Sequence, residues 1–523
     1  MKNWLILPAL LLLALTARAQ QTAGDLIKSG KIKGEKRDYS GAIADFTSAI
    51  ALDPKNAEAY SLRGYSEEYG NDVDRAIADF DQAIKLDPTN SNAYSGRGSA
   101  KLQKGDNDSA LADLNKALEL DSLQIAAHLL RGSIELSKAN YDAAIADYNV
   151  IIALDPKDIA AWGNRAVAKE KKGDLDSALG DFNHLIDLDP KNALSYNGRG
   201  IVKARQGDLD AAIADFNLSV GLNPGYADAF LNRGTAKIKK DDPDGAVADY
   251  EKAAELNPKN ASAYDGLGMA KKEQGDLDGA LAAYDRAIEL DPKTPAFYDN
   301  RGNVKKRKGD LDGAIADYEK AIAIEPKNAA AYDNRGIAKM NKGDMDGAGA
   351  DFDHAIALDP KDPHPHFDLG NMKSLAGNWT EALAEYRRAC DVSPKYRDYP
   401  HLYIWLIRTR NGDADAANTE LADFLTQRLK DDKRAAASDW YSKLAGYLLG
   451  TLTEADLFTA ATSPKAWKDK YQHCEAWYYA GMKKLIAGDK ATAAADFQKS
   501  LDTGVKDLVE YEMSRSELKA LGK

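Results

Sequence analysis

The stretch "YDNRGNVKKRKGDLDGAIADYEKAI", from Tyr298 to Ile322, recurs with variations along most of the chain. Its features repeat every 34 residues, and the clearest marker is a proline that follows an apolar residue and a polar one. These prolines stand at 54, 88, 156, 190, 224, 258, 292, 326, 360 and 394, and Ser122 fills the one missing place in the series. A fixed period of this length indicates a protein built from stacked repeats rather than from ordinary globular domains.

Eleven consecutive units of 34 residues run from Ala23 to residue 396, and residues are assigned below to positions 1–34 of their unit. Position 20 is alanine in all eleven units, position 8 is glycine in all but one, and position 24 is aromatic in all but one. Small residues at positions 8 and 20 allow two helices to approach closely, with the aromatic ring filling the space beside them. Because proline ends the second helix, each unit is predicted to hold helix A over positions 1–14 and then helix B.

These residues resemble the tetratricopeptide repeat (TPR) family of the bacterial exported type, from Ala23 to about Tyr396. The resemblance implies an all-α fold, a TPR α-solenoid in which antiparallel helix pairs form a right-handed superhelix. It also implies that positions 2, 5, 9, 12 and 13 of helix A face a concave groove. The predicted organisation is a signal peptide over 1–19, an eleven-repeat TPR array over 20–396 and a divergent TPR-like helical region over 397–523.

Two positions of the repeat carry coupled charges. Arginine occupies position 7 in eight units, and the same eight units carry aspartate at position 23. Where position 7 is Leu267, position 23 is Ala283, so both charges are lost together. This coupling predicts structural ion pairs between helices A and B, because an unpaired charge on a packing face would cost about 3–5 kcal/mol. The predicted pairs include Arg301 with Asp317 and Arg335 with Asp351.

The quoted stretch also contains lysines and aspartates with other expected roles. Lys305, at position 11, is expected to pack its stem and expose its charged head. The aspartates of "GDLDG" lack the twelve-residue spacing and the closing glutamate of a calcium loop. They are expected instead to cap helix B and to complement its dipole.

Position 13 is basic in four of five consecutive units, and position 12 adds two lysines. Two interpretations remain open. Basic residues near the end of helix A complement the helix dipole, which contributes about 0.3–1 kcal/mol. Alternatively, they form a basic strip that binds a partner with an acidic segment, although aspartates at position 5 face it across the groove. The predicted partner-binding residues are Lys171, Arg205, Lys239, Lys272, Lys306 and Arg307.

The sequence shows no catalytic constellation, because no nucleophile elbow, phosphate-binding loop or zinc-protease signature is present. His128 and His366 occupy position 4, where other units carry tyrosine or tryptophan, so packed histidines are expected rather than metal ligands. The net charge of −12 argues against a nucleic-acid-binding protein. We therefore expect no enzyme activity, no cofactor, no metal and no nucleic-acid partner.

The first residues read as a cleaved signal peptide. Lys2 precedes an apolar run from Leu5 to Leu15, which is too short to cross a bilayer core of about 30 Å. The small residues Ala17 and Ala19 then form a cleavage site. No later stretch is apolar enough to span a membrane, so the protein is predicted to be exported and to be periplasmic or secreted.

The register breaks after Pro394, and aromatic residues become dense. A last unit is predicted to begin at Cys474, with Trp477, Gly481, Gly488, Ala493 and Phe497 at positions 4, 8, 15, 20 and 24. This unit and the closing "DLVEYEMSRSELKAL" are similar to the tail of bacterial envelope TPR adaptors of the new-lipoprotein-I type. The aromatic region is either a terminal cap or a docking surface. Cys390 and Cys474 are either a disulfide pair or two buried thiols.

Together these features predict a non-catalytic exported scaffold or adaptor that binds a protein or peptide partner in the groove. A rigid groove would bind an extended segment or a helix without reordering itself. The alternative is a structural component of a cell-envelope machine for the export or assembly of polysaccharide, pili or outer-membrane proteins. The identity of the partner and the oligomeric state stay open.

Overall fold

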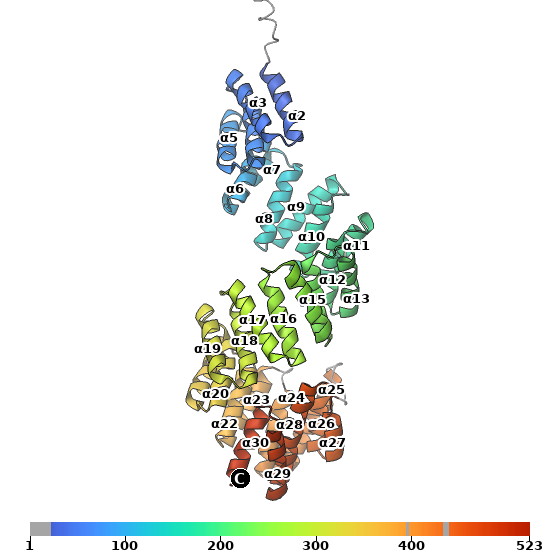
Figure 1. Ribbon diagram of the computed structural model, residues 1–523, viewed down its shortest axis with the longest axis vertical. Helices are drawn as coiled ribbons and strands as arrows, with labels where there is room; N and C mark the ends of the chain where they lie inside the picture. The colour runs from blue at the N-terminus through green and yellow to red at the C-terminus, as the bar shows by residue number, and fades with distance from the viewer. Residues whose placement is uncertain (1–21, 394–396, 432–438) are drawn as a thin grey trace, which may run out of the picture. The chain divides into compact units, whose positions relative to one another are not determined.

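The computed structural model describes residues 22–393, 397–431 and 439–523, and within these ranges the chain forms 29 helices and no strands (Figure 1). The prediction of an all-α repeat fold is confirmed. The predicted signal peptide over 1–19 lies outside the described residues. No helix in the described ranges is both long and apolar enough to cross a membrane.

The chain divides into two compact units, unit 1 from Met1 to Asn232 and unit 2 from Arg233 to Lys523. The boundary falls inside helix A of the seventh repeat, α14 (Ala227–Lys239). The sequence period does not mark this division, because the repeat pattern continues through it without a break.

Eleven helix pairs follow the 34-residue period. The A helices are α2 (Ala23–Glu35), α4 (Ala57–Tyr69), α6 (Ser91–Gln103), α8 (Ile125–Ser137), α10 (Ile159–Lys172), α12 (Ala193–Gln206), α14, α16 (Ala261–Gln274), α18 (Pro295–Lys308), α20 (Ala329–Lys342) and α22 (His364–Leu375). The B helices are α3 (Tyr39–Leu52), α5 (Val73–Leu86), α7 (Asn107–Leu120), α9 (Tyr141–Leu154), α11 (Leu175–Leu188), α13 (Leu209–Leu222), α15 (Pro243–Leu256), α17 (Leu277–Leu290), α19 (Leu311–Ile324), α21 (Met345–Leu358) and α23 (Trp379–Val392). In α18 the helix covers positions 1–14, as predicted.

Capping residues set the helix ends within each repeat. Helix α18 ends at Gly309, whose φ of +83° is the left-handed conformation that glycine adopts most readily. Asp310 then caps α19, and its side chain accepts a hydrogen bond from the Gly313 backbone N–H at 3.0 Å. Asn328 caps α20 in the same way through the Ala331 N–H at 3.1 Å. The expected capping role of the aspartate after position 15 is confirmed at Asp310.

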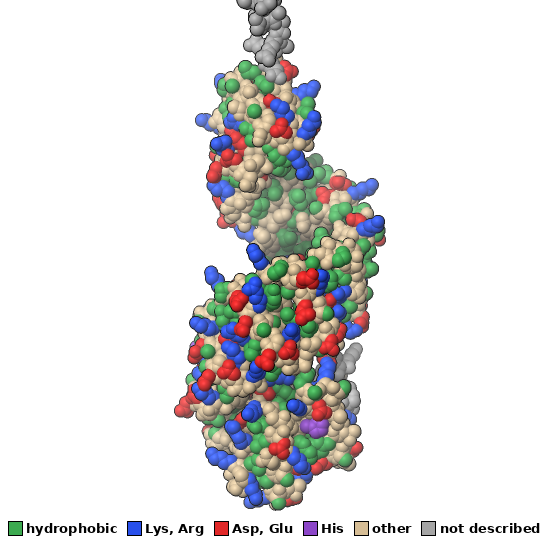
Figure 2. Space-filling view, viewed as in Figure 1, with side chains coloured by type: hydrophobic (Ala, Val, Ile, Leu, Met, Phe, Trp, Pro, Cys, Tyr) green, Lys and Arg blue, Asp and Glu red, His purple; other side chains and the backbone are tan. Residues whose placement is uncertain are grey.

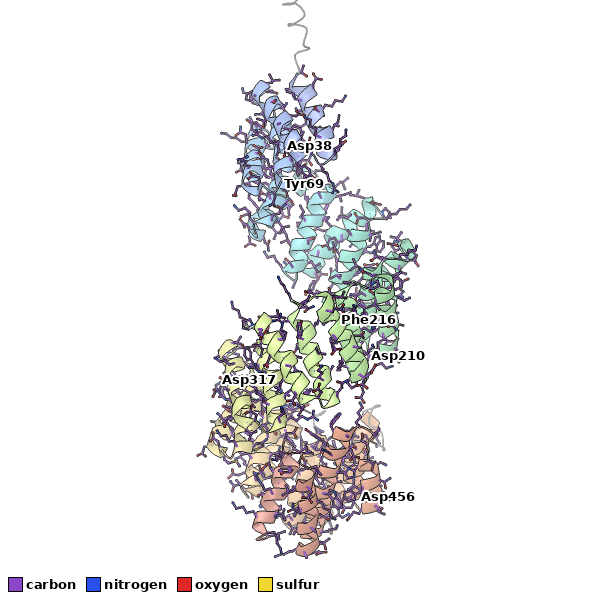
Figure 3. All side chains as sticks on the ribbon, viewed as in Figure 1. Asp38, Tyr69, Asp210, Phe216, Asp317 and Asp456 are labelled. Atoms are coloured by element: carbon purple, nitrogen blue, oxygen red, sulfur yellow. The ribbon has the colours of Figure 1, made fainter. Side chains whose placement is uncertain are left out.

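The aromatic ring at position 24 lies between two A helices. Tyr250 is 1% exposed. A Cβ atom added at Gly234 of its own repeat would lie 3.1 Å from the ring, and one at Gly266 of the next repeat would lie 2.4 Å from it. Phe216, labelled in Figure 3, contacts Gly200 in the same manner. At these sites glycine allows the A helix to pack directly on the ring, which sets the spacing of the helices.

A buried aspartate at position 23 binds two basic side chains. All eight arginines at position 7 donate twice to their aspartate, with N–O distances between 2.5 and 3.0 Å. Asp317 accepts from Arg301 Nε at 2.9 Å and from Arg301 Nη2 at 2.5 Å, and Asp351 accepts from Arg335 at 2.9 and 2.7 Å. Lys305 Nζ lies 2.8 Å from the second carboxylate oxygen of Asp317.

The expectation that Lys305 exposes its head is wrong. Its ammonium group forms an ion pair with Asp317, whose side chain is 4% exposed. Position 11 lies one helical turn after position 7, so both basic residues reach the same carboxylate. The same lysine contact recurs at Lys101, Lys169, Lys203, Lys237 and Lys339.

Further polar contacts connect successive repeats. Arg301 Nη1 donates to Asp285 on α17 of the preceding repeat at 2.6 Å. Lys308, at position 14, forms an ion pair with Asp278 at the start of the same helix. Equivalent pairs join Lys104 with Asp74, Lys138 with Asp108, Lys172 with Asp142, and Lys342 with Asp312. The lysine–aspartate pairs are largely exposed, so each contributes little to stability.

The C-terminal region contains α24 (Asp398–Arg410), α25 (Ala414–Asp431), α26 (Trp440–Leu448), α27 (Glu454–Ala461), α28 (Ala466–Ile486), α29 (Lys490–Asp502) and α30 (Val509–Ala520). These helices share one hydrophobic core with α22 and α23. Tyr403, Trp405, Tyr441 and Tyr447 are buried in it. They are core residues and not a docking surface.

Helix α28 begins at Ala466, eight residues before the predicted start at Cys474. The repeat pattern from Cys474 onward describes only the part of α28 that packs on α29, where a Cβ atom at Gly481 would lie 2.6 Å from Phe497. The two additional turns follow no repeat pattern. Their contacts lie elsewhere in unit 2.

The two cysteines are free and buried. Cys474 Sγ lies 3.3 Å from Ser500 Oγ, and Cys390 Sγ lies 3.6 Å from His401 Nδ1. Burial raises the pKa of each thiol to about 12, so both stay protonated near neutral pH. Of the two interpretations, the structure shows buried thiols.

The second repeat departs from the charge pattern. Glu67 stands at position 11 in place of lysine and is 6% exposed. Burial and the charge of Asp79 raise the pKa of Glu67 to about 7, although Arg63 acts in the opposite direction. A carboxyl group thus occupies a place where nine of the eleven repeats carry lysine, and Glu135 of the fourth repeat is the other exception.

Replacing Asp317 with alanine should destabilise α18 and α19, because Arg301 and Lys305 would lose their shared partner. We expect a loss of about 3–5 kcal/mol in the local free energy of opening, measured by hydrogen exchange of the α18 and α19 amides in the full chain. The double replacement Arg301→Leu with Asp317→Ala reproduces the natural combination Leu267 and Ala283 and should lose less. A double variant as unstable as the single one would refute the pairing.

The stability of α4 and α5 should fall as the pH rises from about 4.5 to about 7. Folding raises the pKa of Glu67 from 4.5 to about 7, so the contribution of its protonated form is complete below pH 4.5 and is lost by about pH 7. We expect a loss of roughly 1–3 kcal/mol in the free energy of opening, measured by hydrogen exchange. Glu67→Lys should reduce this dependence, and the part that remains is expected from Glu68 of the same helix, whose pKa burial also raises. The amides of α10 and α11, where Lys169 pairs with Asp181, are the control. An unchanged pH profile in the variant would contradict the assignment.

Candidate partner-binding site

The candidate site is the A-helix face, defined as positions 5, 9, 12 and 13 of the A helices. In unit 1, Lys171 is exposed at the end of α10. Arg205 of α12 donates to the Glu170 carbonyl oxygen at 2.5 Å and also forms an ion pair with the Glu170 carboxylate. Of these two residues, Lys171 has the more accessible charge. Arg205 links the neighbouring A helices α10 and α12 through Glu170.

The four remaining predicted residues lie in unit 2. Lys239 is exposed at the end of α14, and Lys272 Nζ lies 3.6 Å from Glu273. Lys306 lies near the carboxylates of Asp368, Asp333 and Asp507, and burial lowers its pKa while these charges oppose the shift. The structure therefore surrounds Lys306 with acidic groups of the same chain.

The aspartates at position 5 of unit 2 are partly or wholly buried. Asn300 donates to Asp265 at 2.9 Å, and Asn328 donates to Asp299 at 3.0 Å. Burial raises the pKa of Asp299 to about 6, and burial together with the charge of Asp368 raises the pKa of Asp333 well above its ordinary value. The A-helix face of unit 2 thus carries both signs of charge. On the face of the molecule drawn in Figure 2, basic and acidic side chains are likewise interspersed.

Arg307 contacts the C-terminal region. Its guanidinium lies 5.5 Å from the ring centroid of Trp467 and 5.2 Å from that of Tyr471, both in the first turns of α28. Arg307 Nη1 also donates to the Lys272 carbonyl oxygen at 3.2 Å. Sequence reasoning missed this contact, because nothing in one sequence pairs residue 307 with residues 160 places later. The only signal was an aromatic pair four residues apart that follows no repeat.

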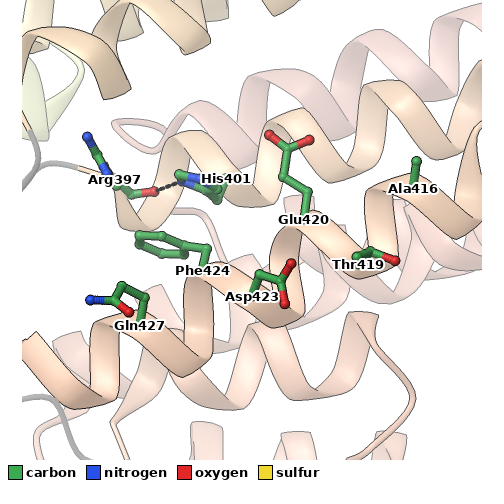
Figure 4. A pocket seen from close by; sticks show the side chains of 8 residues that line it. All are labelled: Arg397, His401, Ala416, Thr419, Glu420, Asp423, Phe424 and Gln427. Carbon is green, nitrogen blue, oxygen red and sulfur yellow. Dashed lines mark hydrogen bonds between the residues drawn. The ribbon is translucent and has the colours of Figure 1, made fainter.

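A second surface feature is an open pocket between α24 and α25, lined by Arg397, His401, Ala416, Thr419, Glu420, Asp423, Phe424 and Gln427 (Figure 4). His401 Nδ1 lies 2.6 Å from the Arg397 carbonyl oxygen, and the His401 ring stacks on Phe424 with centroids 3.8 Å apart. Burial lowers the pKa of His401. A neutral, stacked imidazole beside the protonated thiol of Cys390 is not an activated nucleophile pair.

The histidines at position 4 pack as expected. His128 Nδ1 lies 2.7 Å from Asp147, and His366 Nδ1 lies 2.9 Å from Glu385. Each occupies the place of the aromatic ring and reaches the acidic residue at position 23. Among the described residues, no group of three or more potential ligands is placed to hold a metal ion.

Comparison with known families matches the repeats directly. Profiles described as tetratricopeptide repeat match residues 27–91, 96–159, 164–227, 227–260 and 329–362. A profile described as TPR repeat matches residues 268–309 and 302–343. Together these matches cover more than half of the chain. Among curated proteins, no sequence matches.

Many solved structures also match. A tetratricopeptide repeat protein from Parabacteroides merdae is 22% identical, with coverage of 48% of this chain and 99% of that chain and a TM-score of 0.38. Yeast Tom70 is 18% identical, with coverage of 78% and 99% and a TM-score of 0.39. YrrB, described as a TPR protein with an unusual peptide-binding site, is 26% identical, with coverage of 35% and 95% and a TM-score of 0.30. The family matches and the periodic helix pairs show that the chain belongs to the tetratricopeptide repeat family.

Proposed function

We propose that this protein is a non-catalytic exported scaffold or adaptor that binds a protein segment on the A-helix face. The main support for the proposal is that the recurring positions of each repeat serve packing, whereas position 13 varies. The residues that recur at positions 7, 8, 20, 23 and 24 are engaged in packing and ion pairs within the repeats. Position 13 instead changes from unit to unit, reading Glu35, Tyr69, Gln103, Ser137, Lys171, Arg205, Lys239, Glu273, Arg307, Asn341 and Leu375. A regular frame with a variable face supports recognition of a particular partner.

The charge of the exposed position-13 residues supports a partner with an acidic segment. Lys171 and Lys239 are exposed, one in each unit, in a protein whose net charge is −12. Basic side chains on the A helices of an acidic protein attract an acidic segment to those helices, because the rest of the surface repels it. Lys272, Lys306 and Arg307 have partners in their own chain and contribute less in this state.

Export is part of the same proposal. The support is the sequence of residues 1–19, with its basic start, short apolar run and small residues at the cleavage site. The similarity of the last unit to envelope TPR adaptors agrees with such a location. A scaffold of this kind would meet its partner outside the cytoplasm.

Capture of partners from a cell-envelope extract tests the proposal. The baits are the mature chain, the variant Lys171→Glu with Lys239→Glu, and the matched variant Lys85→Glu with Lys320→Glu, which makes the same charge change at exposed B-helix residues. We expect the first variant to lose about tenfold in affinity for a directly bound partner and the matched variant to retain it.

Folding of each bait is checked by circular dichroism, and affinity is measured at two salt concentrations because the contact is electrostatic. Equal capture by all three baits would contradict the assigned face. A partner that remains in a stable, membrane-associated complex through purification would favour the alternative of a structural component of an export or assembly machine.

A further inference from the structure

The first two turns of α28 lie against repeats that precede them by more than 150 residues. We call residues 465–471 the latch, with the sequence Lys-Ala-Trp-Lys-Asp-Lys-Tyr. Lys465 forms an ion pair with Asp241, between α14 and α15, and its Nζ lies 3.4 Å from the Asp241 carbonyl oxygen. Trp467 and Tyr471 lie against Arg307 of α18. The latch therefore joins the C-terminal helices to helix α18 and to the turn between α14 and α15, both in unit 2.

Helical spacing explains how two rings reach one guanidinium. Trp467 and Tyr471 are four residues apart, so their side chains lie on one face of α28. Their ring centroids are 5.9 Å apart with planes at 84°, and the Tyr471 hydroxyl donates to Asp507. Asp507 holds the Tyr471 ring in place and also lies near Lys306. Basic residues at positions 12 and 13 of one repeat thus meet an acidic and an aromatic group of the C-terminal region.

The contact between the latch and α18 is a partly exposed surface contact and not part of the hydrophobic core. Trp467, Tyr471 and Arg307 are each only partly buried, whereas Tyr478 and Tyr479 further along α28 are fully or nearly fully buried. An open pocket lined by both polar and apolar residues remains beside the latch, bounded among others by Gln274, Arg307, Lys470 and Asp507. Because these three side chains are only partly buried, the first turns of α28 can separate from α18 while the C-terminal core stays folded.

The latch also occupies residues that the repeat pattern assigns to partner binding. Position 13 is basic at Lys171 and Lys239 as well, and these side chains are exposed, whereas Arg307 is covered by the chain's own helix. Helix α28 exceeds the repeat pattern by the same two turns that make this contact. The additional residues have no packing role in the pair that α28 forms with α29.

We propose that the latch is an internal ligand of the A-helix face at Arg307, standing in for a partner helix that carries two aromatic side chains four residues apart and a lysine two residues before the first. Such a helix would replace Trp467 and Tyr471 on Arg307 and Lys465 on Asp241. The inference rests on the proposed function in one respect, the use of the A-helix face for binding. Partner binding at Arg307 then requires the latch to open.

A labelled synthetic peptide with the sequence of residues 462–473 tests the proposal through fluorescence anisotropy. The mature chain and the variant Trp467→Ala with Tyr471→Ala are titrated with the peptide. We expect the peptide to bind the variant at least about tenfold more tightly than the unaltered chain, since the attached latch competes at a high effective concentration. Adding Arg307→Ala to the variant should reverse this gain. Adding Arg286→Ala instead, at an exposed arginine 5.9 Å from the Tyr264 ring on α16 and outside the latch, should leave it unchanged.

Equal affinity for the unaltered chain and the double variant, or binding that survives Arg307→Ala, would overturn the proposal. Hydrogen exchange on the single variant Arg307→Ala gives a second measurement that does not depend on the fold of the double variant. We expect amides of residues 467–473 to exchange at least about tenfold faster and those of 478–485 to be unaffected. Unchanged exchange at 467–473 would also overturn the latch. Neither result depends on the envelope capture, so the proposed function can fail while the latch stands.

Discussion

The repeat architecture depends on a buried carboxylate at position 23 that recurs in most units. At Asp317, for example, the carboxylate accepts two hydrogen bonds from arginine and contacts a lysine, and its side chain is nearly inaccessible. Removing these charges from water costs free energy. The ion pair offsets this cost only when the carboxylate and the guanidinium are in hydrogen-bonding geometry. The pairing therefore favours one register of helix A against helix B, and the glycine at position 8 and the ring at position 24 then fit that register. Stability comes from the packing, and the ion pairs make the packing unique.

The sequence predicts most of this frame because its determinants are local and periodic. The helix bounds, the capping aspartate at Asp310 and the coupling of positions 7 and 23 all follow from residues less than one repeat apart. Lys305 was assigned wrongly because solvent exposure is the usual state of lysine, and the shared carboxylate is visible only in three dimensions. The longer α28 and its contact with Arg307 involve residues far apart in sequence, and no period connects them.

The predicted binding residues differ in what surrounds them. Lys171 and Lys239 are exposed, Arg205 is bonded to Glu170, Lys306 lies among carboxylates, and Arg307 is covered by aromatic rings. Sequence position alone assigned all of them one role. The neighbouring acidic residues and the C-terminal helices decide which side chains are available to a partner, and these neighbours come from different repeats.

The central claim is that recurrent residues build the frame and that the residue at position 13 serves binding. An alanine scan through the repeat 295–328, with each variant of the full chain scored for thermal unfolding, tests it directly. The account predicts losses at Arg301, Gly302, Asp317 and Tyr318, where burial or ion pairing is complete, and little change at Arg307. A loss at Arg307 as large as that at Asp317 would show that position 13 belongs to the frame and would contradict the division between frame and binding face.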